Sequence, residues 1–216
     1  MGLFRTTLHW PPPAPETPLE KLTWCVIDTE TSGLDTRRDR VLSLGAFDVS
    51  MAGIVLNRRF EAVLKIDIPL NEHNILIHRL TPQQLTLGRE LRETYSRFLR
   101  HIRDKPLLAF HAAFDKAMLE RELRINLNLT CRLPFSDVAF WLRALFPEQR
   151  QFRTLDDWMA HFRLEMPNRH QAAIDALCTA ELALIALHQA QRQGLQTLKQ
   201  LDETVRTSAA LHALSH

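Results

Sequence analysis

Two acidic residues stand two positions apart in VIDTETSGL, residues 26–34, where an apolar run ends. Side chains alternate between the faces of a β-strand, so Asp28 and Glu30 point to the same face. Neighbouring carboxylates raise each other's pKa unless a cation lies between them. Oxygen ligands in an open site suit Mg²⁺ or Mn²⁺. An acid pair can also simply end a strand in water, and Asp-X-Glu alone does not decide between the two interpretations.

Two later segments add acids that could join this pair. In LLAFHAAFDKAML, residues 107–119, Asp115 follows an apolar run and begins a helix. In RHQAAIDALCTAEL, residues 169–182, His170 and Asp175 stand at the start of the longest helical pattern. Asp115 could instead be a first-turn acid favoured by the helix dipole, and His170 a solvated imidazole. Asp175 lies among apolar residues, where a lone acid needs a partner.

Hydrophobic periodicity predicts the elements that position these residues. Apolar, β-rich runs predict strands at 22–29, 41–49, 54–65 and 106–110. Apolar residues at helical spacing predict helices at 88–102, 112–124, 137–146, 154–162, 171–193 and 196–205. Thr154 is a candidate N-cap, and Gly194 a candidate helix stop. Three strands followed by a helix, a strand and further helices predict a mixed sheet flanked by helices.

The chain divides into an arm and one domain. Residues 1–21, with PPPAPETP at 11–18, predict a Pro-rich extended arm without a regular element. Residues 22–216 are enough to bury the core of a single domain.

Charge, cysteine usage and hydropathy exclude several classes of protein. The net charge of +2 is too small for a protein that coats duplex DNA by bulk electrostatics. Cys25, Cys131 and Cys178 are too far apart for a zinc pair or a disulfide framework, which favours a cytoplasmic location. The sequence shows neither a secretory signal nor an uncharged apolar window that could cross a membrane, so we expect no membrane partner.

The ordered motifs VIDTETSGL, HAAFD and H-x-x-x-x-D resemble the DEDDh family of 3′–5′ exonucleases, over roughly residues 22–190. This family includes the proofreading epsilon subunit of bacterial DNA polymerase III and ribonuclease T. SLGAFDV, IHRLT, SDVAF and TLDDW support the resemblance. It implies an α/β, RNase H-like fold. The mixed five-stranded sheet would have three initial antiparallel strands, then parallel strands, and helices would flank it.

The resemblance also implies roles for individual residues. The four acids that would hold two Mg²⁺ or Mn²⁺ ions are Asp28, Glu30, Asp115 and Asp175, and His170 would be the general base. The implied substrate-binding residues are Thr29, Thr31, Leu34, His78 and His111. The family usually has His-Asn where this chain has Phe110-His111, and Gly where it has Arg79. These departures concern residues that would contact the substrate, and none of them is an implied metal ligand.

The resemblance therefore implies a hydrolase that releases nucleoside 5′-monophosphates from single-stranded 3′ ends, with DNA favoured over RNA. Two cations can activate water and stabilise the leaving oxygen, and a neutral histidine base predicts activity that rises through about pH 7 to 8. The alternatives are an RNA-trimming exoribonuclease or oligoribonuclease, a polymerase proofreading subunit, and a noncatalytic module that binds nucleic-acid ends or a polymerase. A homodimer and a polymerase partner both stay open.

Three arginines follow the first acidic motif. Arg37, Arg38 and Arg40 could contact backbone phosphates beside the site. Asp35 and Asp39 are interleaved with them and nearly cancel their charge, so a solvated loop is slightly favoured.

Overall fold

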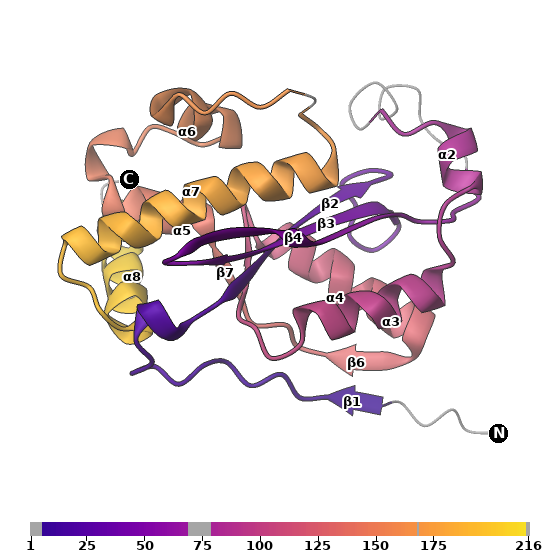
Figure 1. The fold of residues 1–216 in the computed structure, drawn as a ribbon, viewed down its shortest axis with the longest axis horizontal. Helices are drawn as coiled ribbons and strands as arrows, with labels where there is room; N and C mark the ends of the chain where they lie inside the picture. The colour runs from indigo at the N-terminus through magenta and orange to yellow at the C-terminus, as the bar shows by residue number, and fades with distance from the viewer. Residues whose placement is uncertain (1–5, 69–78, 168, 215–216) are drawn as a thin grey trace.

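The computed structural model describes residues 6–68, 79–167 and 169–214 (Figure 1). Its main sheet has five strands in the order β4-β3-β2-β5-β7. They are β2 (Trp24–Thr31), β3 (Val41–Ser50), β4 (Gly53–Val63), β5 (Leu107–Ala109) and β7 (Phe135–Asp137). Strand β3 pairs antiparallel with both β2 and β4, while β5 pairs parallel with both β2 and β7. The predicted mixed five-stranded sheet is confirmed.

Helices cover both faces of this sheet. They are α2 (Pro82–Thr86), α3 (Leu91–Ile102), α4 (Ala113–Leu127), α5 (Val138–Leu145), α6 (Leu155–Phe162), α7 (Ala172–Arg192) and α8 (Leu198–Leu214), with 3-10 turns η1 (Leu19–Lys21) and η2 (Pro147–Gln149). Figure 1 shows α6 and α7 on one face and α3 and α4 on the other. Thr154 caps α6 as predicted, and Gly194 follows the end of α7 with a φ of 81°.

The side chains of β2 alternate between two hydrophobic cores. Trp24 and Val26 pack in the cluster that α5, α6, α7 and α8 share. Cys25 and Ile27 pack in the cluster on the side of α3 and α4. Because the strand period is two, Asp28 and Glu30 continue the face of Trp24 and Val26. The two acids therefore emerge on the side of the sheet that α7 covers.

Helix α7 has the length and composition of a membrane span, with a mean hydropathy of 1.3 in its most apolar window. Of that window, 56% is buried inside the protein. Its apolar residues belong to the first core cluster, together with residues of β2 and β3. A helix in the core of a protein can be as long and as apolar as a membrane span. Its burial in this core cluster is the pattern of such a core helix.

The arm is more ordered than its proline content predicts. Residues Thr6–Leu8 form β1, which pairs in parallel with β6 (Leu129–Cys131), so the expectation of no regular element was wrong. The short strand β6 offers unpaired backbone groups, and pairing with the arm satisfies them. Trp10 is buried and donates its indole N–H to the carbonyl of Lys105 at 3.2 Å. The division into an arm, 1–21, and a domain, 22–216, stays a prediction.

The rest of the arm is bonded to the start of α8. Leu19 donates its backbone N–H to the carbonyl of Gln196 at 2.9 Å, and Lys199 donates to that of Pro15 at 2.7 Å. Pro18 and Thr197 form an isolated β-bridge. The segment that leads into η1 is thus joined to the start of α8 by main-chain hydrogen bonds.

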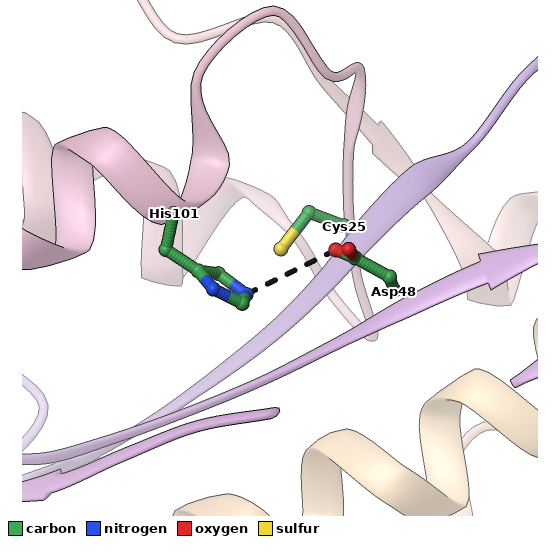
Figure 2. Close-up of side chains that lie close together, drawn as sticks. All are labelled: Cys25, Asp48 and His101. Carbon is green, nitrogen blue, oxygen red and sulfur yellow. Dashed lines mark ion pairs between the residues drawn. The ribbon is translucent and has the colours of Figure 1, made fainter. Parts of the chain in front are cut away.

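A buried ion pair joins β3 to the turn before β5. Lys105 Nζ lies 2.7 and 2.8 Å from the two carboxylate oxygens of Asp48, and it also donates to the carbonyl of His101 at 2.7 Å. Figure 2 shows Cys25 and His101 beside this carboxylate, with His101 Nε2 3.9 Å from it. These are metal-ligand residue types, but the Lys105 ammonium already neutralises Asp48. Burial and the nearby Lys105 lower the pKa of His101.

We expect the substitution Lys105→Met to reduce the free energy of unfolding by about 3 to 5 kcal/mol, because it leaves the Asp48 carboxylate buried and unpaired. Urea denaturation measures the change, and the double variant Asp48→Asn/Lys105→Met should recover part of the loss. The control Lys65→Met removes an exposed ion pair with Glu90 and should leave stability nearly unchanged. Equal stability of the single variant and the wild-type protein would contradict the assignment.

Candidate active site

Three of the predicted acids converge at the end of β2. Asp28 and Glu30 come from that strand, and Asp175 comes from the first turn of α7. One carboxylate oxygen from each lies within 4.8 Å of the others. Such a set of hard oxygen donors fits a divalent cation that keeps part of its water shell. The metal fit thus rests on atoms from two elements that lie far apart in the sequence.

The fourth acid lies beside this group. Asp115 is in the first turn of α4 and is only 5% exposed. Its Oδ1 accepts a hydrogen bond from the Thr29 hydroxyl at 2.8 Å. Its charge is the strongest of the neighbouring charges that raise the pKa of Asp28. Asp28 therefore interacts with Asp115 and with the group around Asp175.

Burial and mutual repulsion shift the protonation of these acids. Burial, followed by the charges of Asp175 and Asp115, raises the pKa of Glu30 to about 7. Burial also raises the pKa of Asp115 to about 7, against the hydrogen bond from Thr29. The pKa of Asp28 is raised well above its ordinary value, first by burial and then by its acidic neighbours. A bound cation would favour the ionised forms and reverse these shifts.

Gly45 permits the approach of α7 to the acids on β2. It is the cross-strand partner of Asp28, and a Cβ at this position would collide with the main chain of Ala172 and Ala173. The first turn of α7 therefore lies directly on β3, and Asp175 comes within reach of Asp28. A side chain at position 45 would move the helix away.

His170 and a neighbouring arginine lie next to Asp175. The backbone N–H of His170 lies 3.3 Å from both Asp175 oxygens, and its side chain is exposed. Arg169 donates to Asp175 and, at 3.1 Å, to Asp156. Its positive charge lowers the pKa of Asp28 and Glu30 against their burial. The sequence analysis did not single out Arg169; its position directly before the histidine was the available signal.

The predicted substrate-binding residues are distributed around the acids. The hydroxyl of Thr29 is engaged by Asp115, and that of Thr31 donates to the carbonyl of Gly33 at 2.7 Å. Leu34 is 86% exposed on the loop that follows. His78 lies outside the described residues. His111 is exposed beside the start of α4.

The two departures from the family pattern share one backbone feature. His111 and Arg79 both have a φ of 56°, in the left-handed region that Asn and Gly adopt most readily. At His111 the conformation is held by Asp137, whose carboxylate accepts from the N–H groups of His111 and Ala112, each at 3.1 Å. Both positions of this chain thus have a backbone conformation that Asn and Gly adopt readily, although neither residue is Asn or Gly.

The sequence pattern of the exonuclease family matches residues 25–183, which include all four acids and His170. The chain belongs to the exonuclease family. This match, with the relatives that follow, confirms the resemblance to the DEDDh family of 3′–5′ exonucleases.

Relatives of this chain include proteins named as DNA polymerase III or its epsilon subunit. DNA polymerase III PolC-type of Bacillus subtilis is 30% identical over 193 residues, which are 89% of this chain and 13% of that protein. DNA polymerase III subunit epsilon of Treponema pallidum is 26% identical over 200 residues, 88% of this chain and 92% of that protein. The chain thus spans a small part of the PolC relatives but nearly all of the epsilon relative.

Solved structures share the fold of this exonuclease. Escherichia coli exonuclease I in complex with a dT13 oligonucleotide has a TM-score of 0.68 and 18% identity, covering 80% of this chain and 42% of that one. Exonuclease X in complex with 5′ overhanging duplex DNA has a TM-score of 0.62 and 19% identity, covering 84% of this chain and 99% of that one. At these identities the likeness concerns the fold.

The raised carboxyl pKa values predict how stability depends on pH without metal. Glu30 and Asp115, with pKa values of about 7, hold protons in the folded state that the unfolded chain releases near its ordinary values of 4.5 and 3.8. The unfolded state therefore binds fewer protons, so the free energy of unfolding falls as pH rises towards 7. We expect the Tm in EDTA to fall between about pH 5 and 8, and Mn²⁺ to raise it most at the upper end.

Differential scanning fluorimetry across this pH range measures the effect. The double variant Glu30→Gln/Asp115→Asn should show a flatter pH profile and a smaller Mn²⁺ shift. An unchanged slope in that variant would contradict the assignment of the pH dependence to these acids.

Proposed function

We propose that this chain is a metal-dependent 3′–5′ exonuclease that hydrolyses phosphodiester bonds at single-stranded 3′ ends, with DNA as its substrate, and releases nucleoside 5′-monophosphates. The observation that carries the proposal is the convergence of Asp28, Glu30 and Asp175 within 4.8 Å, with Asp115 beside them. An isolated acid at a strand end is solvated by water. Four acids that are partly or fully buried together need a neutralising positive charge, which bound cations would supply.

The donor set fits two divalent cations. Carboxylate oxygens are the ligands that Mg²⁺ and Mn²⁺ prefer, and Asp28, Glu30, Asp115 and Asp175 are the residues that would hold the ions. Two such cations, when bound, supply activation of water and stabilisation of the departing 3′ oxygen. The four acids would fix the distance between the two ions and neutralise part of their positive charge.

His170 and Leu34 have separate roles in the proposal. The exposed imidazole of His170 accepts the proton of the attacking water, and the contacts of its backbone N–H with Asp175 tie its position to the acids. Leu34, exposed after Thr31, offers an apolar surface to the terminal base. His78, at the terminal phosphate, and His111 complete the substrate contacts that the family resemblance implies.

Several observations support the choice of substrate and setting. Exonuclease I and exonuclease X, which share this fold, are described in complex with DNA. The epsilon relative supports a polymerase partner. The three cysteines are free and buried, as suits a cytoplasmic protein. A homodimer and RNA trimming stay open alternatives to a monomer acting on DNA.

We expect Asp28→Asn to abolish the release of 5′-dTMP from a dT10 oligonucleotide in Mg²⁺, since it removes one of the carboxylates that would hold the cations. His170→Gln should slow turnover by about 10² to 10⁴-fold, the usual contribution of a general base. Chromatography of the released nucleotides measures both effects. His188→Gln, an exposed histidine on the same helix, is the matched control and should keep the wild-type rate.

The same assay on matched DNA and RNA oligonucleotides, with and without EDTA, separates the alternatives. Preferential degradation of RNA would replace the DNA assignment by an exoribonuclease. The absence of metal-dependent products from both substrates would favour the noncatalytic binding module, and a wild-type rate for His170→Gln would remove the base assignment.

A further inference from the structure

An open pocket lies on the outer side of α4, next to the loop that connects β2 to β3. Its volume is about 450 Å³, within the range of pockets that hold small ligands. The polar side chains that line it are Thr36, Arg37, Glu120, Arg121, Arg124 and Thr130. They come from the loop, from α4 and from β6, so the pocket is built by three separate segments.

The pocket carries a positive charge. Three arginines line it against one acid, Glu120. Glu120 accepts a hydrogen bond from the backbone N–H of Leu133 at 2.7 Å, and its carboxylate lies 4.0 Å from Lys116 Nζ. Its negative charge is therefore partly neutralised by groups outside the pocket. Arg37 and Arg124 are exposed. Arginine and threonine side chains are common donors to backbone phosphates.

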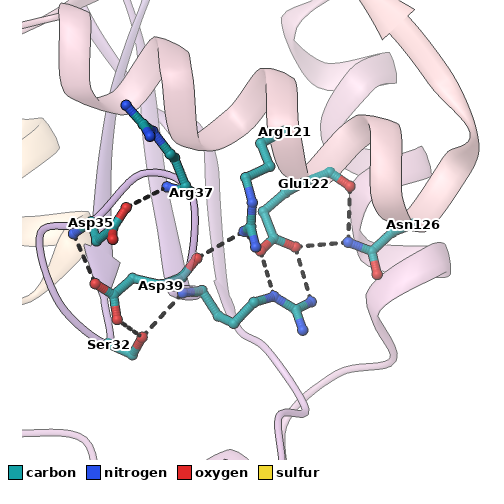
Figure 3. A network of polar contacts seen from close by, with 8 residues as sticks. Ser32, Asp35, Arg37, Asp39, Arg121, Glu122 and Asn126 are labelled. Carbon is teal, nitrogen blue, oxygen red and sulfur yellow. Dashed lines mark hydrogen bonds and ion pairs between the residues drawn. The ribbon is translucent and has the colours of Figure 1, made fainter.

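A buried glutamate fixes the loop against α4. Glu122 is 0% exposed, and Arg40 donates to its two oxygens at 2.6 and 3.1 Å. Arg121 lies 3.5 Å from the same carboxylate and donates to the carbonyl of Asp39 at 2.8 Å (Figure 3). Asn126 donates to Glu122 at 2.7 Å. Two guanidinium groups thus share one carboxylate, which leaves a net positive charge in the wall of the pocket.

The acids of the loop are engaged in its own structure. Asp39 accepts from the Ser32 hydroxyl and from the backbone of Asp35, each at 2.8 Å. Asp35 accepts from the backbone of Arg37 at 2.8 Å and pairs loosely with Arg38. Figure 3 shows the Arg37 side chain extending from the loop towards α4. The loop is thereby shaped before a ligand arrives.

The pocket lies a few nucleotides away from the acids. Asp115 is in the first turn of α4, and at about 1.5 Å per residue Arg121 and Arg124 follow it by about 9 and 13 Å along the helix. A stacked strand rises by about 3.4 Å per nucleotide. The helix turns by about 100° per residue, so both arginines lie on other sides of α4 than Asp115, and these axial separations are lower bounds. A strand whose 3′ end is at Asp115 would therefore need at least about three to four nucleotides to reach these arginines along the loop that follows β2.

We propose that this pocket binds the backbone phosphates of a single strand from about the fourth nucleotide from its 3′ end onward. The proposal rests on the exonuclease function and deepens it, because it makes the substrate a strand of several nucleotides rather than a dinucleotide. The solvated-loop interpretation favoured by the sequence holds for Arg38, while Arg40 is bound to Glu122. Arg37 and Arg124 are the side chains available to the strand.

The length dependence of hydrolysis tests the pocket. For the wild-type protein, KM in Mg²⁺ should fall from dT2 to about dT5 and then level off, because the pocket becomes filled. In the double variant Arg37→Ala/Arg124→Ala, KM for dT10 should rise about tenfold, since each exposed ion pair contributes a factor of up to about five. KM for dT2 should change less than twofold, and Arg124→Lys should retain most of the effect of length.

A matched control removes the same charge elsewhere. Arg150→Ala/Arg192→Ala takes away two exposed arginines, the second of them at the far end of α7 from Asp175. If the pocket binds the strand, this control keeps the wild-type dependence on length. An equal rise of KM in both double variants would show a general charge effect and would overturn the proposal.

A binding measurement separates this proposal from the proposed function. Fluorescence anisotropy of 5′-labelled dT10 with the Asp115→Asn protein in EDTA needs no turnover. Adding Arg37→Ala/Arg124→Ala should weaken binding and reduce the salt dependence by about one to two phosphate contacts. Unchanged affinity and salt dependence would overturn the pocket even if the wild-type enzyme is active. A wild-type protein that binds through these arginines but hydrolyses nothing would instead overturn the exonuclease function.

Discussion

Mutual repulsion of carboxylates in a small, partly buried volume is the constraint on which this structure depends. Asp28 and Glu30 end a central strand, Asp115 begins α4, and Asp175 begins α7. Burial raises the pKa values of Asp28 and Asp115, and for Asp28 the charges of its acidic neighbours raise the pKa further. Protons or cations can relieve both effects. The fold must therefore supply rigid positions for acids that would otherwise separate. It does so by placing two of them on β2 itself and the other two on helices that pack against β2 and β3.

The strand order explains how such positions arise. β2 is the middle strand of five, antiparallel to β3 and parallel to β5. The parallel pairing brings the end of β5, and hence the start of α4, to the edge where β2 ends. On the other face, Gly45 lets α7 lie against β3 next to Asp28. The acids thus meet where two helices start beside one strand end, and the missing side chain of a glycine sets how closely one helix can approach.

The apolar run of β2, and the length and helix-forming residues of α4 and α7, were sufficient to predict the elements that carry the acids. Such patterns were insufficient for β7 and β1, each three residues long, since strands so short are defined by their partners. Asp28 and Glu30 share a face by strand geometry alone, whereas the neighbourhood of Arg169 depends on how its loop folds back. Glu122 lies in a helix rich in charges, and only the tertiary structure reveals that it is buried beneath two arginines.

The main-chain bonds between the arm and the start of α8 have a consequence for how the molecule comes apart. Leu19 is buried in the same core as Leu198 and Leu201 of that helix, so neither segment can leave without uncovering apolar surface of the other. The segments 15–19 and 196–201 should consequently exchange their amide hydrogens as one cooperative unit. A shortened protein starting at Leu22 should keep the acids in place, but the start of α8 would lose its main-chain partners and expose its apolar residues.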